Sequence, residues 1–210
     1  MADSYGLLDL SNAERLLVEQ KTEVFQSRKR YKIKNERGRI VYYMVDEPSG
    51  CLSGSSSMNI LNLNQQEVIY LSRQRSCESV SCFPLCCGSF QKLEVRSYCG
   101  DLLGRVDEIV GWSAESYDVK DGSGNIVFKI KKAPGSCCRK SVEFKILSPD
   151  KSTEIGQIIK RWGNLRQEKF SKVDHFGVSF PFDLDVHIKA VLMGACFMIH
   201  DFHFKEGRRR

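Results

Sequence analysis

The chain has 210 residues, of which 41% are hydrophobic and 28% are charged. This composition is typical of a globular protein with one substantial core, and it excludes both a disordered chain and a membrane protein with many spans. The formal net charge of +6 favours contact with anionic lipid or nucleic acid over acidic partners, and it does not choose between the two.

The N-terminal region carries the first predicted element. The sequence MADSYGLLDL has no basic region before an apolar run, so no secretory signal is predicted. The nine cysteines are therefore expected in reducing surroundings, without stable disulfides. The sequence SNAERLLVEQK predicts a helix over residues 13–21, with Ser11 or Asn12 as its N-cap and with Leu16 and Leu17 facing inward.

A different pattern follows and repeats five times: a run of β-branched, aromatic and leucine residues, a break of Asn, Asp, Gly, Pro or Ser, and a second run. This pattern is typical of β-hairpins. The predicted turns fall at residues 35–38, 64–65, 99–101, 121–125 and 148–152. The sequences NLRQEKF and HFGVSFPF predict two further strands, which brings the total to twelve. Because consecutive antiparallel strands leave exposed edges in an open sheet, we expect a closed barrel over residues 31–180.

The most hydrophobic segment lies near the C-terminus, where residues 190–199 form an uninterrupted apolar run. As a helix this run spans about 15 Å, whereas a bilayer core is about 30 Å thick. Extending it takes in Lys189 and Asp201, and each charge costs roughly 2.5 to 3.5 kcal/mol near the membrane centre. Apolar side chains fall on every face of the run, so the helix must be wrapped. The sequence favours a helix over residues 186–205 buried inside the barrel, with a membrane span as the alternative.

Four segments carry a resemblance to a known family: KRYKIKNERGRIVYYMVDE, SCFPLCCGSFQKLEV, EIGQIIKRWGNL and FGVSFPFDLDVHIKAVLMGACFMI. Over nearly its whole length the chain resembles the phospholipid scramblase family. The resemblance implies a mainly β, tubby-like fold in a single domain over residues 1–210: a closed twelve-stranded antiparallel barrel around a hydrophobic C-terminal helix, preceded by an N-terminal helix and lead-in over residues 1–25. The chain departs from the family at His200 and His203, which interrupt the helix with polar side chains.

The resemblance also implies a calcium site in an acidic loop just before the helix, which here runs from Lys172 to Asp183. Calcium takes roughly six to eight oxygen ligands. Asp174 and Asp183 fit the third and the last position of the loop and Gly177 the sixth, and Asp185 adds an oxygen from just outside. Lys172 places a cation where the first carboxylate belongs, so we expect weak binding, with a dissociation constant of about 10⁻⁴ to 10⁻³ M. The alternative is that FPFDLD is a buried strand whose aspartates cap the following helix.

The cysteines Cys82, Cys86 and Cys87 match the palmitoylated cluster of the family. Each buried methylene of an acyl chain adds roughly 0.8 kcal/mol of membrane affinity, and two or more chains anchor a protein firmly. A zinc site is one alternative, although its spacing is not standard and no histidine is close in sequence; its ligands would come from Cys77, Cys82, Cys86, Cys87, Cys137 and Cys138. Inert thiols are the other alternative.

Two groups of basic residues are candidates for contact with anionic lipid, at about 1 kcal/mol for each residue near such a surface. A solvated face is the alternative explanation of these residues. They are Arg28, Lys29, Arg30, Lys32, Lys34, Arg208, Arg209 and Arg210. The segment GQIIKRW, which ends in Lys160, Arg161 and Trp162, resembles a segment proposed to engage nuclear import, and this resemblance implies a nuclear pool. The alternative is an ordinary strand that ends in two basic residues.

Motifs of enzymes are missing: the sequence has no nucleophile elbow, no phosphate-binding loop and no zinc-protease helix. The resemblance implies calcium-activated, ATP-independent movement of phospholipids between bilayer leaflets. Together with the missing enzyme motifs, it leads us to expect lipid translocation without bond chemistry, at the cytoplasmic face of a cellular membrane. The expected cofactors are calcium and covalent palmitate, and the expected partners are membrane phospholipids, preferentially anionic. Nucleic acid is disfavoured, because the net charge is modest. The alternative function is a lipid-binding adaptor or transcription-linked scaffold without transport activity.

Overall fold

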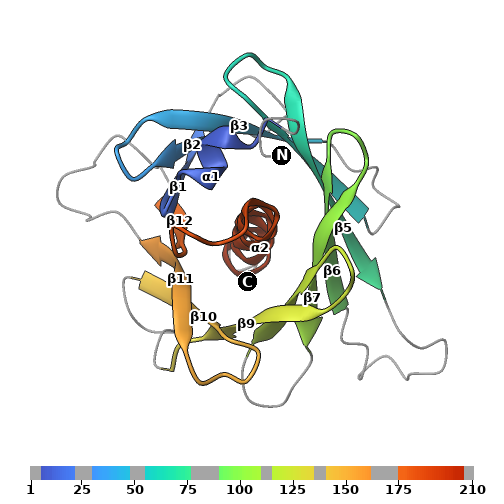
Figure 1. The fold of residues 1–210 in the computed structure, drawn as a ribbon, viewed down its shortest axis with the longest axis vertical. Helices are drawn as coiled ribbons and strands as arrows, with labels where there is room; N and C mark the ends of the chain where they lie inside the picture. Colours follow the sequence, from blue (N-terminus) through green and yellow to red (C-terminus); the bar gives the residue numbers. More distant parts are fainter. Residues whose placement is uncertain are drawn as a thin grey trace.

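Twelve antiparallel strands form a closed barrel around a long C-terminal helix in the computed structural model (Figure 1). The structure describes residues 6–21, 30–47, 55–76, 90–109, 115–134, 141–161 and 175–205. The closed twelve-stranded barrel with its C-terminal helix confirms the predicted fold class. The elements are α1 (Leu8–Ser11), β1 (Arg15–Lys21), β2 (Arg30–Asn35), β3 (Ile40–Asp46), β4 (Ser55–Leu61), β5 (Glu67–Ser76), β6 (Phe90–Ser97), β7 (Leu102–Ile109), β8 (Ser116–Asp121), β9 (Ile126–Lys132), β10 (Ser141–Leu147), β11 (Glu154–Arg161), β12 (His175–Ser179) and α2 (Val186–Lys205).

All five predicted hairpins form, and each turn lies where the sequence places it. The β8–β9 turn illustrates the cause. Asp121 accepts hydrogen bonds from the backbone N–H groups of Ser123 and Asn125 at 2.9 and 2.8 Å, and Gly124 adopts a φ of 90° that a side chain would disfavour. On β8 itself Tyr117 and Val119 are buried while their neighbours are not, so alternation aims every second side chain into the barrel.

The N-terminal helix predicted over residues 13–21 is wrong, because this segment is strand β1. Leu16 and Val18 are buried, whereas Leu17 between them is 36% exposed; this is the period of a strand, not of a helix. β1 pairs with both β2 and β12 and so closes the barrel, which begins at Arg15 and not at residue 31. The sequence NLRQEKF, predicted as a strand, lies outside the described residues.

Helix α2 fills the barrel, as the burial prediction requires (Figure 1). Every residue from Ala190 to Ile199 is buried. Phe197 meets Tyr31 and Phe176 edge-on, with ring centroids 5.8 and 5.5 Å apart. In the described ranges no helix has the length and apolar content needed to cross a membrane.

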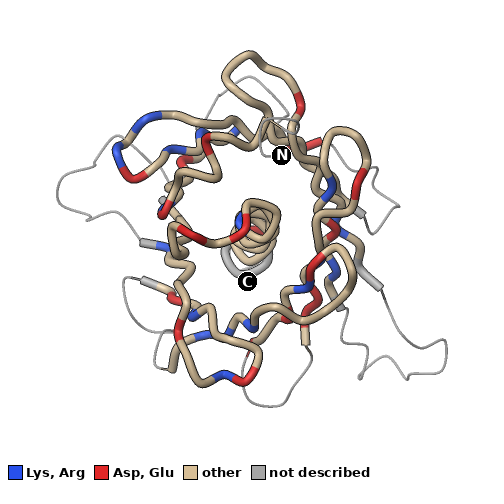
Figure 2. Tube along the Cα trace, in the orientation of Figure 1, with Lys and Arg blue, Asp and Glu red and all other residues tan. Residues whose placement is uncertain are grey.

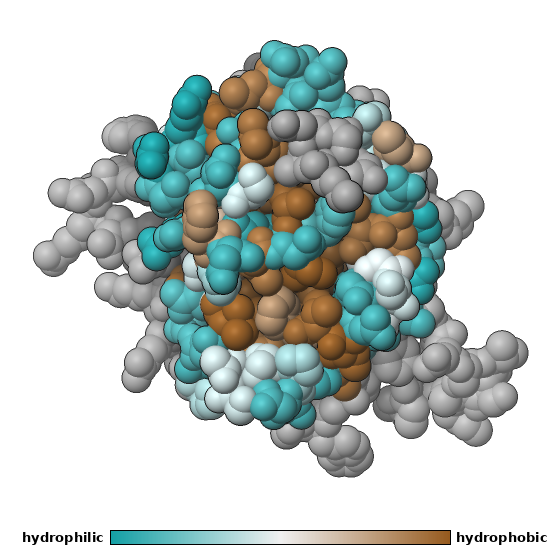
Figure 3. Space-filling view, viewed as in Figure 1, coloured by the Kyte–Doolittle hydropathy of each residue, from teal (hydrophilic) through white to brown (hydrophobic). Residues whose placement is uncertain are grey.

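The two ends of the barrel differ. One, called here the turn end, carries the five hairpin turns, α1, residues 180–185 and the start of α2. The other, called the loop end, is where the strands are joined by the longer connections, and where α2 finishes. Figure 3 shows apolar residues gathered over the centre of the face seen in Figure 1, where α2 lies, with hydrophilic residues toward the margin.

Candidate functional site

The predicted calcium loop is only partly a loop. Residues His175–Ser179 form strand β12, and Gly177, the expected turn glycine, pairs with Leu17 and Ile159. Four strand steps separate His175 from Ser179 by about 13 Å, and of the aspartates that the resemblance assigns to the loop, only Asp183 is described. A calcium ion holds its oxygens at about 2.3 to 2.6 Å. The described residues of the loop therefore do not fit a single-ion site.

The two described aspartates of this region have different surroundings. Asp183 is exposed in the turn between β12 and α2. Asp185 is the N-cap of α2: its Oδ1 accepts hydrogen bonds from the backbone N–H groups of His187 at 2.9 Å and Ile188 at 3.2 Å. Capping of the helix is thus observed at Asp185, although residues 180–185 are not a strand. Within the described ranges no three His, Cys, Asp or Glu side chains could share a metal ion. Lys172 and Asp174 lie outside those ranges, and calcium binding stays a prediction.

This difference predicts unequal effects of two matched substitutions. Asp185→Ala is expected to lower the free energy of unfolding by about 1 kcal/mol, because two N–H groups at the helix start lose their acceptor. Asp183→Ala removes the same carboxylate from an exposed turn, and it should change stability by less than about 0.5 kcal/mol. Urea denaturation measures both. Equal effects would contradict the assignment of the cap to Asp185.

The strongest polar cluster at the turn end is built on Lys189, which sequence analysis treated only as an interruption of the apolar run. Its side chain is fully buried. Nζ donates hydrogen bonds to the carbonyl oxygens of Ser11, Ala13 and Phe182 at 2.8, 2.9 and 2.7 Å. Burial lowers the pKa of Lys189, and the charges of Glu14 and Asp183 oppose that shift. We call Lys189 and these three carbonyls the lysine clamp, because they join α2 to the chain before β1 and to the turn after β12.

A second polar group lies inside the barrel toward the loop end. His200 is 2% exposed and stacks on Phe176, with centroids 3.9 Å apart and planes at 18°. Asp201 faces Arg73 at 3.7 Å. Lys160, from the predicted import segment, is also 2% exposed.

The rest of the import segment and most of the predicted lipid contacts fall at or beyond the limits of the described ranges. Arg161 ends β11, and Trp162 lies outside, so nuclear import stays a prediction. Arg30 is exposed at the loop end, where β2 begins. Outside the described residues are Cys82, Cys86, Cys87, Arg28, Lys29, Arg208, Arg209 and Arg210. Their lipid contacts, and the zinc alternative, stay predictions.

Two described cysteines are free thiols in opposite surroundings. Cys99 is exposed in the β6–β7 turn, at the turn end, and Cys196 is buried in α2. Burial raises the pKa of the Cys196 thiol, so the thiolate needed for acylation or oxidation is suppressed there. Cys99 is accessible but stands alone in its turn. It therefore serves as a reference for the cysteine cluster of residues 82–87.

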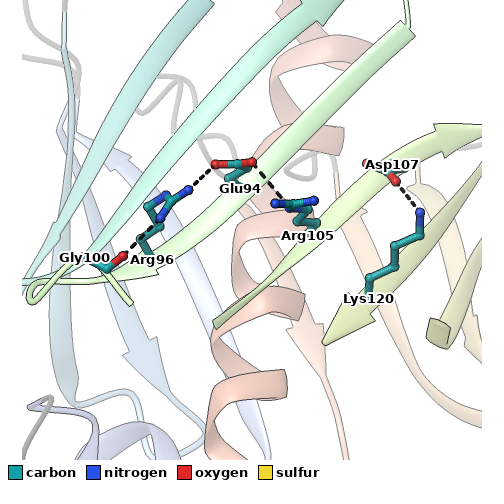
Figure 4. Close-up of polar contacts among 6 residues, drawn as sticks. All are labelled: Glu94, Arg96, Gly100, Arg105, Asp107 and Lys120. Atoms are coloured by element: carbon teal, nitrogen blue, oxygen red, sulfur yellow. Dashed lines mark hydrogen bonds and ion pairs between the residues drawn. The ribbon is translucent and has the colours of Figure 1, made fainter. Parts of the chain in front are cut away.

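Charges on the outer wall of the barrel largely neutralise one another. Figure 4 shows Glu94 between Arg96 and Arg105, at 2.9 and 3.3 Å, and Asp107 paired with Lys120 at 2.6 Å. Figure 2 shows both signs distributed around the wall. Exposed pairs of this kind contribute about 0 to 1 kcal/mol each. They give the wall a mixed surface and mark no site on this side.

Comparison with known proteins matches the chain to one family. The family model "Scramblase" covers residues 2–206. Phospholipid scramblase 2 of Bos taurus is 33% identical over 97% of this chain and 72% of its own length. Phospholipid scramblase 1 of Homo sapiens and of Mus musculus are each 33% identical over 96% of this chain, which spans 66% and 64% of their lengths. An X-ray structure of a protein from Arabidopsis thaliana aligns with a TM-score of 0.49 and 14% identity, over 92% of this chain and 98% of that one.

Proposed function

Because this chain belongs to the phospholipid scramblase family, we propose that it moves phospholipids between bilayer leaflets without ATP, held at the cytoplasmic face of a membrane. The movement makes and breaks no covalent bond, so it needs no catalytic nucleophile. Palmitate on Cys82, Cys86 and Cys87 would anchor the barrel, and nearby basic residues would favour anionic headgroups.

The observation that supports this proposal is that the described strand and helix ends next to the predicted lipid contacts lie at one end of the barrel. The cysteine cluster lies between Ser76, the last residue of β5, and Phe90, the first of β6, and these two residues pair at the loop end. Arg30 pairs with Lys21 at the same end, directly after Arg28 and Lys29 in sequence. Helix α2 also runs toward this end, so the chain continues from there to Arg208–Arg210. Chain segments that leave the barrel at the same end can contact the same membrane surface at the same time.

Replacing the three clustered cysteines by serine is expected to move the protein from the membrane fraction to the soluble fraction. A single acyl chain gives only reversible binding, and two or more give firm anchoring. Cys99→Ser is the matched control, because this exposed thiol lies at the turn end and its loss should leave the distribution unchanged. Cell fractionation before and after hydroxylamine treatment measures the effect. If the triple variant fractionated like the unsubstituted chain, acylation would not be the anchor.

Transport itself is tested with purified protein in liposomes that carry a fluorescent phospholipid. Exchange between leaflets above that of protein-free liposomes supports the proposal, and its absence at all protein densities contradicts it. The same assay with and without millimolar calcium tests the predicted activation. In this proposal no residue of the described part of the chain holds calcium, because these residues offer no group of three His, Cys, Asp or Glu ligands.

A lipid-binding adaptor without transport is the second candidate, and the filled barrel favours it. Residues 190–199 of α2 occupy the interior and are buried, so the described part of the chain has no open interior path for a headgroup. Transport would have to use the outer surface of the barrel or a disturbance of the adjoining bilayer. Binding of the protein to liposomes without leaflet exchange would support the adaptor.

A further inference from the structure

A trough follows strand β12 on the outer wall of the barrel. β12 lies between β1 and β11, so Gly177 stands between Leu17 and Ile159 in one row across the sheet. These positions face outward, because Phe176 and Val178, which flank the glycine, are buried. The middle strand supplies no side chain in this row. The result is a hollow of about 170 Å³ with apolar walls.

The close approach of the neighbouring backbone requires glycine at position 177, whether or not the trough binds a ligand. A Cβ at Gly177 would lie 2.5 Å from the carbonyl oxygen of Leu16, which is closer than any real contact. The neighbouring strand approaches so closely that this position must stay without a side chain. The hollow is therefore a fixed consequence of the barrel closure between β1 and β12.

The next row of the sheet makes the trough polar at its turn end. Ser179 stands between Arg15 and Gln157, and all three line the same hollow. Ser179 contributes only a hydroxymethyl group. The hollow thus has an apolar half beside Leu17 and Ile159 and a polar half beside Arg15.

Arg15 has an uncompensated charge, unlike two cations on nearby strands, Lys34 and Lys145. Lys34 pairs with Glu19 at 2.7 Å, and Lys145 pairs with Glu154 at 2.8 Å. Arg15 is exposed and forms no ion pair with any residue that the structure describes, including Glu14 beside it in the chain. An anionic group at the polar half of the trough would meet this guanidinium without displacing a carboxylate.

We infer that the trough binds part of one acyl chain of an anionic phospholipid, with the headgroup beside Arg15. The hollow of about 170 Å³ is large enough for a segment of an acyl chain and too small for a whole phospholipid. A peptide strand is disfavoured, because β1, β12 and β11 are each paired on both sides and offer no edge for backbone hydrogen bonds. This inference rests on the proposed function, since it names where the barrel would hold the lipid.

Soluble short-chain lipids test the trough without a membrane. Isothermal titration with dihexanoyl phosphatidylserine, below its micelle concentration, is expected to show binding to the unsubstituted chain. Ser179→Leu fills the hollow and should weaken binding at least tenfold. Ser116→Leu is the matched control: it is the same change at an outward position of β8, four strands away, and should alter affinity less than twofold. Thermal denaturation verifies that both variants fold.

Arg15→Gln tests the charge separately. Loss of one cation near an anionic group is worth about 1 kcal/mol, or roughly fivefold in affinity. Binding of dihexanoyl phosphatidylserine should fall by that factor, while dihexanoyl phosphatidylcholine should be unaffected. Unchanged binding to Ser179→Leu, or absence of any binding to the unsubstituted chain, would overturn the inference. Leaflet exchange measured in parallel distinguishes the two failures: exchange without binding at the trough refutes the trough alone, and absent exchange refutes the proposed transport.

Discussion

Replacing Lys189 with methionine is expected to lower the free energy of unfolding by about 2 to 4 kcal/mol. Methionine has a similar length but donates no hydrogen bond, so the carbonyl oxygens of Ser11, Ala13 and Phe182, which Nζ contacts at 2.7 to 2.9 Å, lose their donor. A buried acceptor without a donor costs roughly 1 to 3 kcal/mol. We expect the largest loss at Ala13, whose bond is buried, and smaller losses at Ser11 and Phe182, whose bonds are part-buried. For a chain of this size the midpoint of thermal unfolding should fall by about 10 °C.

Lys145→Met is the matched control for this substitution. Lys145 pairs with Glu154 on the outer wall, and both side chains are 43% exposed. Loss of an exposed pair costs about 1 kcal/mol at most. Chemical denaturation of the two variants compares the same change inside and outside the barrel. If Lys189→Met were no more harmful than Lys145→Met, the clamp would not hold the helix in place.

The pH dependence of the unsubstituted chain measures the cost of burying the Lys189 charge. Burial lowers the pKa of Lys189 below its ordinary value, so between the folded and the unfolded pKa the unfolded chain binds more protons. Stability then rises with pH in that window, and the contribution is lost as pH falls through the folded pKa. The difference in stability between the unsubstituted chain and Lys189→Met should therefore grow with rising pH in the alkaline range.

Local chemistry made the five hairpins predictable from sequence. Each turn contains a left-handed glycine or a side chain that hydrogen-bonds to the backbone of the same turn. Asn35, for example, accepts hydrogen bonds from the N–H groups of Arg37 and Arg39. The alternation of buried and outward residues continues on both sides of such turns. Because these signals act within about ten residues, they can be found without knowing the rest of the fold.

The features that sequence analysis missed depend on contacts between distant segments. The apolar pair Leu16 and Leu17 suits a helix as well as a strand. The segment is a strand because its backbone pairs with β2 and β12. The lysine clamp joins Lys189 to Ser11 and Ala13, which lie 178 and 176 positions earlier in the chain. The spacing of the predicted calcium loop likewise gave no sign that Gly177 would be held extended between two neighbouring strands.

Phe197→Ala is expected to lower the free energy of unfolding by about 3 to 5 kcal/mol. The side chain is 1% exposed, and its ring packs edge-on against Tyr31 of β2 and Phe176 of β12. Truncation therefore opens a cavity between the helix and two strands that the closed wall cannot easily fill. The midpoint of urea denaturation measures the loss.

Phe182→Ala makes the same chemical change at a residue that is 58% exposed in the turn before α2. The Phe182 ring lies 5.5 Å from Nζ of Lys189, and an exposed contact of this kind contributes about 0.5 to 1 kcal/mol. The backbone carbonyl that Lys189 contacts is kept in this variant, so its effect should stay within about 1 kcal/mol. A large difference between the two variants requires α2 to be enclosed by the chain's own wall. If both variants lost similarly little free energy of unfolding, the helix would lie outside the barrel. The interior would then not be filled by the helix, and the argument that favours the adaptor over transport would fail.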